Sequence, residues 1–363
     1  MVRCMSRQIM LALIGLALIL SAAAYLYLRS VQEPQQAQLE EYWPTEGWRT
    51  APPGDLGLDA QRLGSMVDHI RSDLPTVDSV MVVRHGYVAV DEYFGSFTAE
   101  QRHRIFSCTK SVTSTLVGIA LEDGLIPGLD SEVLGLLPGY EARNVNQWKE
   151  SITLRHLLPM ASGIDARDDY PDNWLWLDRM LGAPDPVQYC LDLNVTVQPG
   201  TRFKYTNANS HLMSAIVTEV TGMPALDYAR EKVFEPLGIA DVEWESDPQG
   251  VNWGHDRLYM RPRDMAKLGL LFLRGGEWDG EQVVPAEWAA EATTRKIAAD
   301  IFPGYAYQWW TGDGFYCAMG YAGQFIYVFP SRDMVVVFTG RTMNNFENPR
   351  NLIRDYILPS VVR

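Results

Sequence analysis

A serine and a lysine three positions apart, Ser107 and Lys110, are the residues whose types and spacing first suggest chemistry. Apolar residues recur at intervals of three and four as far as Leu121, which predicts a helix that begins at Ser107. Residues three apart share a helix face, so the lysine amine can reach the serine hydroxyl. A lysine takes a serine proton only where burial or neighbouring charge lowers its pKa. The pair predicts a nucleophile beside its base, although Ser-x-x-Lys alone is also typical of a polar helix start.

A second candidate group is Tyr205-Thr206-Asn207, which lies between a Pro-Gly turn at residues 199–200 and an apolar helical pattern. A phenol with a pKa near 10 acts as a base only where nearby positive charge stabilises the phenolate, and Lys110 would supply that charge. Asn207 would orient the lysine or a substrate carbonyl. Taken alone, a tyrosine packed at a loop also explains Tyr205.

The third candidate is the small-residue stretch 318–324, Ala-Met-Gly-Tyr-Ala-Gly-Gln, which leads into a strand pattern. Small residues let backbone N–H groups approach a ligand closely. An oxyanion hole needs such a donor beside the N–H of the nucleophile Ser107. The stretch alone is also typical of an ordinary glycine-containing strand entry.

The elements that must position these residues are strands at both ends of a domain and helices between them. Strand patterns at residues 79–84 and 87–93 flank a His-Gly turn, and a helix is expected at 58–74. Helical patterns follow at 152–160, 209–221, 225–234 and 265–274, then strands at 305–310, 325–329 and 334–338 and a closing helix at 349–358. We therefore predict an α/β (α+β) fold: an antiparallel sheet built from both ends of the domain, flanked by helices, with an inserted helical lobe at about residues 135–295.

Length, charge and the amino terminus limit the class of protein. The 363 residues are 47% hydrophobic with a net charge of −14, and no basic stripe is present, which argues against nucleic acid as a partner. Residues 9–28 carry no charge, so residues 1–29 are predicted to be a transmembrane anchor or, alternatively, a cleaved signal segment. A polar linker is expected at 30–50 and a single folded domain, which carries the three candidate groups, at 51–363. Either form of the amino terminus predicts export: a bacterial inner-membrane protein with its catalytic domain on the periplasmic side, or a secreted one.

The cysteines do not define a cofactor or a compartment. No CxxC pair or HExxH motif occurs, so no metal site and no other cofactor is expected. Cys108 is interpreted as a small buried residue beside the nucleophile. Cys190 and Cys317 can pair only if the fold brings them together.

The order Ser107-x-x-Lys110, Tyr205-x-Asn207 and then a glycine-containing strand resembles the serine β-lactamase and penicillin-recognising superfamily, specifically its class C-like branch. The sequence segments 152–158, 161–164, 199–210 and 234–238 also resemble that branch. Within it the chain resembles 6-aminohexanoate-dimer hydrolases and related esterases, on the motifs at 162–165, 168–170, 263–266, 307–310 and 323–324. The resemblance covers roughly residues 55–360 and implies a β-lactamase/transpeptidase-like fold with the site between the sheet and the helical lobe.

The resemblance also implies roles for further residues. Tyr170 would hydrogen-bond the amide or the leaving group, Trp310 would form a wall of the pocket, and His255 would line its rim. Each also has a structural explanation: a surface tyrosine, a core tryptophan and a loop histidine.

The third motif departs from the class C pattern, which has Lys-Thr-Gly or His-Thr-Gly. In the preferred register this chain has Ala-Met-Gly at 318–320, and the second oxyanion donor is the N–H of Tyr321. In the other register it has Tyr-Ala-Gly at 321–323, and the donor is the N–H of Gln324. Neither register offers a cation for a carboxylate, which argues against efficient penicillin turnover.

We therefore predict a serine hydrolase that cleaves a small-molecule ester or amide through an acyl-enzyme on Ser107 and needs no cofactor. The alternative enzyme is a D,D-peptidase or β-lactamase that acts on cell-wall peptides or β-lactams. A second alternative is a membrane-tethered binding protein without turnover.

Overall fold

The computed structural model describes residues 18, 20–21, 39–166, 174–341 and 347–362, with the backbone alone at 174–176. The chain divides into two units, Met1–Glu40 and Glu41–Arg363, and the second carries the fold described below. Within the described ranges, no helix is both long enough and apolar enough to cross a bilayer. The apolar segment predicted at 9–28 lies almost entirely outside those ranges, as does Tyr170.

Eight strands of the second unit form one antiparallel sheet in the order β2-β1-β13-β12-β11-β10-β9-β8. The central strands β1, β12 and β13 are buried at every position, so both faces of the sheet are covered. The strands are β1 Val77–Arg84, β2 Tyr87–Tyr93, β8 Ile297–Ala298, β9 Gly304–Tyr305, β10 Trp310–Gly312, β11 Phe315–Gly320, β12 Gln324–Phe329 and β13 Met334–Gly340.

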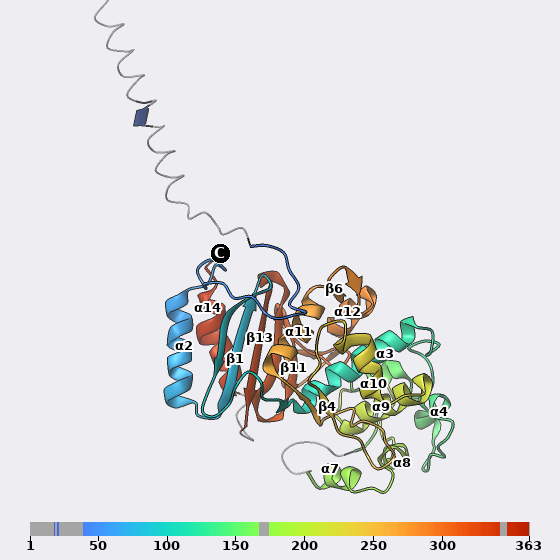
Figure 1. The fold of residues 1–363 in the computed structure, drawn as a ribbon. Helices are drawn as coiled ribbons and strands as arrows, with labels where there is room; N and C mark the ends of the chain where they lie inside the picture. The colour runs from blue at the N-terminus through green and yellow to red at the C-terminus, as the bar shows by residue number, and fades with distance from the viewer. Residues whose placement is uncertain (1–17, 19, 22–38, 167–173, 342–346, 363) are drawn as a thin grey trace, which may run out of the picture. The chain divides into compact units, whose positions relative to one another are not determined.

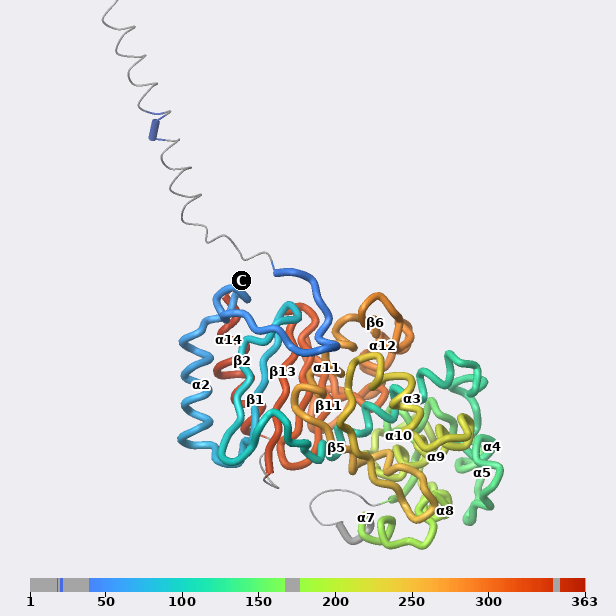
Figure 2. The backbone as a smooth tube through the Cα atoms, in the orientation of Figure 1, coloured from blue at the N-terminus to red at the C-terminus, as the bar shows by residue number. Residues whose placement is uncertain are grey.

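The two ends of the unit meet in this sheet, as the sequence predicts. The β1–β2 hairpin turns at His85 and Gly86, whose φ angles of 54° and 79° are those of a tight primed turn. β1 then pairs along its whole length with β13, from Val77 opposite Gly340 to Arg84 opposite Met334. Figure 2 shows these two strands side by side, although they come from opposite ends of the unit.

Helices cover both faces of the sheet. α2 (Ala60–Asp73) packs with the C-terminal helices on one side, and α11 (Pro262–Leu273) packs on β12 and β13 on the other (Figure 1). The other helices are α3 Thr109–Glu122, α4 Val133–Leu136, α5 Gln147–Glu150, α6 Leu154–Leu157, α7 Trp174–Leu181, α8 Pro186–Asp192, α9 Asn207–Thr221, α10 Ala225–Ala229, α12 Ala286–Thr293, α13 Glu347–Leu352 and α14 Leu358–Ser360, with single turns η1 Phe106–Cys108, η2 Arg230–Phe234, η3 Tyr321–Gly323, η4 Pro330–Arg332 and η5 Ile353–Ile357. A small second sheet joins β3 His103–Arg104, β5 Leu258–Met260 and β4 Glu243–Trp244, and a third joins β6 Glu277–Trp278 and β7 Glu281–Gln282.

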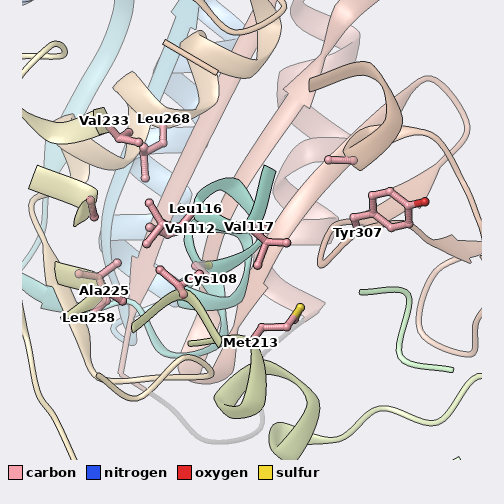
Figure 3. Close-up of a cluster of buried hydrophobic side chains, with 14 of the residues drawn as sticks. Cys108, Val112, Leu116, Val117, Met213, Ala225, Val233, Leu258, Leu268 and Tyr307 are labelled. Carbon is pink, nitrogen blue, oxygen red and sulfur yellow. The ribbon is translucent and has the colours of Figure 1, made fainter. Parts of the chain in front are cut away.

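Helix α3, which follows the predicted nucleophile, is the buried centre of this unit. Every residue from Thr109 to Ala120 is buried, so neighbours enclose the helix on all sides. Figure 3 shows its apolar side chains Val112, Leu116 and Val117 among residues of the surrounding elements, including Met213 of α9. Because its surroundings are tightly packed, the start of α3 is a rigid support for reactive groups.

Two of the predicted boundaries are wrong. The expected linker at 30–50 extends too far, because residues from Glu41 onward belong to the second unit. The Tyr42 hydroxyl donates to the Gly86 carbonyl at 2.9 Å, and the Trp278 indole donates to Thr45 at 2.8 Å. The helical lobe at 135–295 is also too wide, because α11 packs on the sheet and Gly269 lies so close that a Cβ there would be 2.5 Å from Val335.

Two predicted elements are shorter than expected. The helix predicted at 152–160 is reduced to α6, Leu154–Leu157. The strand predicted at 305–310 is two short strands, β9 and β10, because Gln308 between them has a φ of 65° and reverses the chain. The remaining helices and strands lie within a few residues of their predicted positions.

Candidate active site

Ser107 lies in the η1 turn that enters α3, and its side chain is partly exposed. The turn is closed by the Cys108 N–H, which donates to the Ile105 carbonyl at 3.1 Å. The preceding residue, Phe106, has a φ of 47°, a left-handed conformation that costs a non-glycine residue about 1 to 3 kcal/mol. Such strain persists only where the surroundings impose it, so the chain is forced into the bend that presents Ser107.

Lys110 is the hub of the site. Its side chain is only 1% exposed, and its Nζ donates to Ser107 Oγ at 2.9 Å, to Asn207 Oδ1 at 2.8 Å and to the His255 backbone carbonyl at 3.0 Å. These three acceptors fix the amine nitrogen within reach of the serine hydroxyl. When the amine is neutral, its lone pair can accept the hydroxyl proton in this same position.

Tyr205 completes the predicted group. Its ring centroid lies 4.9 Å from Lys110 Nζ, and its face stacks on Trp310 with centroids 5.8 Å apart and an angle of 16° between the planes. Thr206, the next residue, accepts a hydrogen bond from the Ala208 N–H and so caps α9. The cap sets where α9 begins, and the packing of α9 against α3 places Tyr205 and Asn207 beside Lys110.

The third motif forms the end of the β11–β12 hairpin. β11 ends at Gly320, and a Cβ on Gly320 would lie 2.3 Å from the Ile105 carbonyl oxygen and 3.2 Å from Phe106. This strand end therefore touches the turn that carries Ser107, with room for a glycine alone. The oxyanion donor, the N–H of Tyr321 in the preferred register or of Gln324 in the other, stays a prediction.

An aromatic wall lies beside Tyr205. Trp310 is 3% exposed, and its ring meets Tyr305 at 4.8 Å, Phe203 at 5.9 Å and Phe302 at 6.0 Å between centroids. The wall is built from β9, β10 and the loop that carries Tyr205. Trp310, Tyr305 and Phe302 are buried, so these rings pack behind Tyr205, and only Phe203 is partly exposed.

His255 does not lie on a rim, as the resemblance implied. Its side chain is 2% exposed, and neither ring nitrogen has a hydrogen-bond partner among the described residues. Burial, and then the positive charge of Lys110, lower the pKa of His255 well below its usual value, so the ring is neutral. Its contribution to the site is the backbone carbonyl, which accepts from Lys110.

The cysteines near the site are inert. Burial raises the pKa of the Cys108 thiol far above its usual value, so this neighbour of Ser107 stays protonated and does not compete as a nucleophile. Cys108, Cys190 and Cys317 are buried thiols and form no disulfide among the described residues, so the pairing left open for the last two does not occur.

Sequence reasoning missed Gln308, which ties the aromatic wall to α3. Its carbonyl accepts from Ser111 of α3 at 2.7 Å, and its Oε1 accepts from Ser210 of α9 at 2.7 Å. Its Nε2 donates to the Leu158 carbonyl at 2.6 Å. The sequence does contain a hint of this role, because Gln308 is a single amide side chain among aromatic residues. A buried amide needs hydrogen-bond partners, and the predicted strand offered none.

The site and its scaffold define a β-lactamase/transpeptidase-like fold. A penicillin-binding protein homologue from Pyrococcus abyssi, which is an octamer, matches with a TM-score of 0.65 and 21% identity over 83% of this chain and 77% of that one. A family VIII carboxylesterase matches with a TM-score of 0.67 and 16% identity over 85% of this chain and 98% of that one.

The family model described as Beta-lactamase matches residues 63–357, and the protein belongs to this family. Among curated relatives, the 6-aminohexanoate-dimer hydrolase of Paenarthrobacter ureafaciens is 26% identical over 335 residues, which is 83% of each chain. The resemblance inferred from the motifs is thus confirmed at the level of the family and its fold.

Proposed function

We propose that this protein is a serine hydrolase that cleaves an ester or amide bond by transferring the acyl group first to Ser107 and then to water. The observation that carries the proposal is the 2.9 Å contact between Lys110 Nζ and Ser107 Oγ, with the amine held from two other sides by Asn207 and the His255 carbonyl. A solvated surface lysine needs no such enclosure.

In the proposed acylation step, Ser107 Oγ attacks the substrate carbonyl carbon while Lys110 accepts the hydroxyl proton. The N–H groups of Ser107 and Tyr321 stabilise the oxyanion. Lys110 and Tyr205 then return the proton to the leaving alcohol or amine as the carbonyl re-forms. Water attacks the acyl-enzyme by the same route, which restores Ser107 and releases the acid.

The aromatic wall supports a small substrate with an apolar acyl or leaving group. Phe203, which is partly exposed, offers ring surface beside Tyr205, with the buried Trp310 packed against both rings. The strand that precedes Tyr321 has Ala318 and Met319 where the related D,D-peptidases carry a cation. A substrate carboxylate would find no charge complement on that strand. We therefore favour esters and linear amides, in keeping with the carboxylesterase and 6-aminohexanoate-dimer hydrolase relatives, over β-lactams and cell-wall peptides.

The test uses the purified full-length protein beside Ser107→Ala. Wild type is expected to release nitrophenol from p-nitrophenyl butyrate and to bind a fluorophosphonate probe, whereas the alanine variant does neither. Nitrocefin and a linear 6-aminohexanoate dimer, assayed in parallel, separate β-lactamase from amidase activity. If wild type and Ser107→Ala both fold but neither hydrolyses the ester nor binds the probe, the enzyme proposal is refuted and the alternative of a binding protein is favoured.

Export of the catalytic unit is a separate proposal that depends on residues 9–28. Cell fractionation and amino-terminal sequencing of the mature protein test it. An intact amino terminus in the membrane fraction supports an anchor, and a new terminus near the alanines at 22–24 supports a cleaved signal.

A further inference from the structure

The loop at residues 254–257 lies along the catalytic helix and supplies it with two consecutive carbonyls. The Gly254 carbonyl accepts from Thr113 Oγ1 at 2.8 Å, and the His255 carbonyl accepts from Lys110 Nζ at 3.0 Å. Lys110 and Thr113 are three apart on α3 and so share one face. The loop can therefore hold the catalytic amine only while it keeps its register against that face.

On its other side the same loop is pressed against α9. A Cβ on Gly254 would lie 2.2 Å from the Ser210 carbonyl oxygen, so only glycine permits this approach. At the far end of the loop, Arg257 has a φ of 64°. The loop is thus held in a bend that a residue other than glycine or asparagine rarely adopts.

Asp256 fastens the loop to β3 through an ion pair with Arg104. Arg104 Nε donates to Asp256 Oδ1 at 2.9 Å, and its Nη2 makes a second bond to Oδ2. Oδ1 also accepts from the N–H of Arg257, so the carboxylate is bound to its own loop as well as to β3. The side chains of Arg104 and Asp256 are 33% and 13% exposed, which distinguishes this bidentate pair from a fully solvated one.

Arg104 also contacts the turn that carries the nucleophile. Its guanidinium carbon lies 4.6 Å from the centroid of the Phe106 ring, and the Phe106 ring meets the edge of Tyr321 at 5.5 Å. Phe106 is the residue with the left-handed backbone that precedes Ser107. One arginine therefore touches both the nucleophile's turn and the loop that holds the base.

We propose that the Arg104–Asp256 ion pair positions Lys110 relative to Ser107. Through Asp256 it keeps the His255 carbonyl on Lys110, and through Phe106 it keeps the bent turn of Ser107 against the Tyr321 hairpin. Both are positioning residues, since neither contacts Ser107 or Lys110 in any hydrogen bond described above. The inference goes beyond the proposed function and depends on it only where acylation of Ser107 is the reaction measured.

The test compares Asp256→Asn and Arg104→Met with Arg102→Met in the full-length protein. Arg102 pairs with Glu243 at 3.1 Å beside the same small sheet, and its side chain is 35% exposed, so it matches Arg104 in exposure but not in contacts. Loss of positioning is expected to lower kcat for p-nitrophenyl butyrate about 10- to 100-fold with KM within about threefold of wild type. The Arg102 variant should keep the wild-type kcat and KM. Arg104→Lys should have a higher kcat than Arg104→Met, because lysine restores the positive charge but not the bidentate hydrogen bonding of the guanidinium group.

Amide hydrogen exchange gives a second measurement that needs no activity. Peptides that cover 105–110 and 254–257 should exchange faster in Asp256→Asn than in wild type and Arg102→Met, while those of β12 and β13 stay unchanged. If Asp256→Asn keeps the wild-type kcat and the wild-type exchange rates, the inference is overturned. If no protein hydrolyses the ester, the proposed function fails, and the exchange of these two segments alone decides whether the ion pair holds them.

Discussion

The contact between Gly320 and the nucleophile's turn predicts that a single methyl group will impair the site. In Gly320→Ala the new Cβ would lie 2.3 Å from the Ile105 carbonyl oxygen and 3.2 Å from Phe106. Real Cβ atoms essentially never approach closer than 3.0 Å, so the hairpin and the turn must separate by at least 3.0 − 2.3 = 0.7 Å. That separation moves the N–H of Tyr321 away from Ser107.

The expected effect is on the rate rather than on binding. A misplacement of about 1 Å in a catalytic group costs roughly 100-fold, and loss of one oxyanion donor costs about 100- to 1,000-fold in kcat. We expect kcat to fall about 100-fold, or about 2.7 kcal/mol of transition-state stabilisation. Overpacking of this kind also lowers the free energy of unfolding by about 1 to 3 kcal/mol.

The assay is the nitrophenyl ester turnover and the rate of fluorophosphonate labelling, each normalised to folded protein by circular dichroism. Gly64→Ala is the matched control, because Gly64 lies within α2 and has no atom within 4 Å of its added Cβ. It should keep kcat and stabilise the fold by up to about 1 kcal/mol. A folded Gly320→Ala variant with kcat within threefold of wild type would show that the donor lies elsewhere, as the register with Gln324 requires.

Two further predictions concern stability. Lys149 is buried, and its Nζ donates to the carbonyls of Leu191, at 2.7 Å, and Arg143, so Lys149→Met should lower the free energy of unfolding by about 1 to 3 kcal/mol in denaturant titrations without changing kcat. Burial, partly opposed by Lys267, raises the pKa of Asp264 from 3.8 to about 6, so the folded state binds the proton more tightly than the unfolded chain. The contribution of Asp264 to stability is therefore lost as the pH rises from about 4 to 6, by up to about 3 kcal/mol, and Asp264→Asn should abolish this loss. If the free energy of unfolding depends on pH in the same way in wild type and Asp264→Asn, the prediction for Asp264 is wrong. If Lys149→Met has the denaturation midpoint of wild type, the prediction for Lys149 is wrong.

Local patterns predicted most of the fold. The hairpin at His85-Gly86 and the helix α2 were evident because alternation, spacing and turn residues are properties of short segments. The contact between Ser107 and Lys110 was also predictable, because residues three apart share a helix face. The contact between Asn207 and Lys110 was expected only from the family resemblance. What failed depends on contacts between distant segments.

The polar stretch before Ala51 is one segment whose structure depends on such distant contacts. Its composition suggested a linker, yet the Tyr42 hydroxyl donates to the Gly86 carbonyl, and the Trp48 indole donates to the Arg263 carbonyl at 3.1 Å. A few aromatic side chains suffice to fix an otherwise polar segment when the partner surface is present. The sequence of the segment does not reveal that surface.

The break in the strand at Gln308 and the role of the His255 backbone were also not predicted. Gln308 leaves the strand conformation because Ser111, Ser210 and the Leu158 carbonyl satisfy its polar groups. His255 acts through a backbone carbonyl, which every residue type has. Sequence patterns report side chains, so a function that resides in the main chain gives no signal.

The pairing of β1 with β13 has a consequence for the order in which the protein acquires structure. The β1–β2 hairpin is made early in synthesis, but its partner strand, Met334–Gly340, follows about 250 residues later. Until then β1 has an open hydrogen-bonding edge and apolar side chains on both faces, which is a template for pairing between nascent chains. The growing chain must therefore be kept from self-association until nearly all of it has been made, and a chain that lacks even its last strand should accumulate in aggregates.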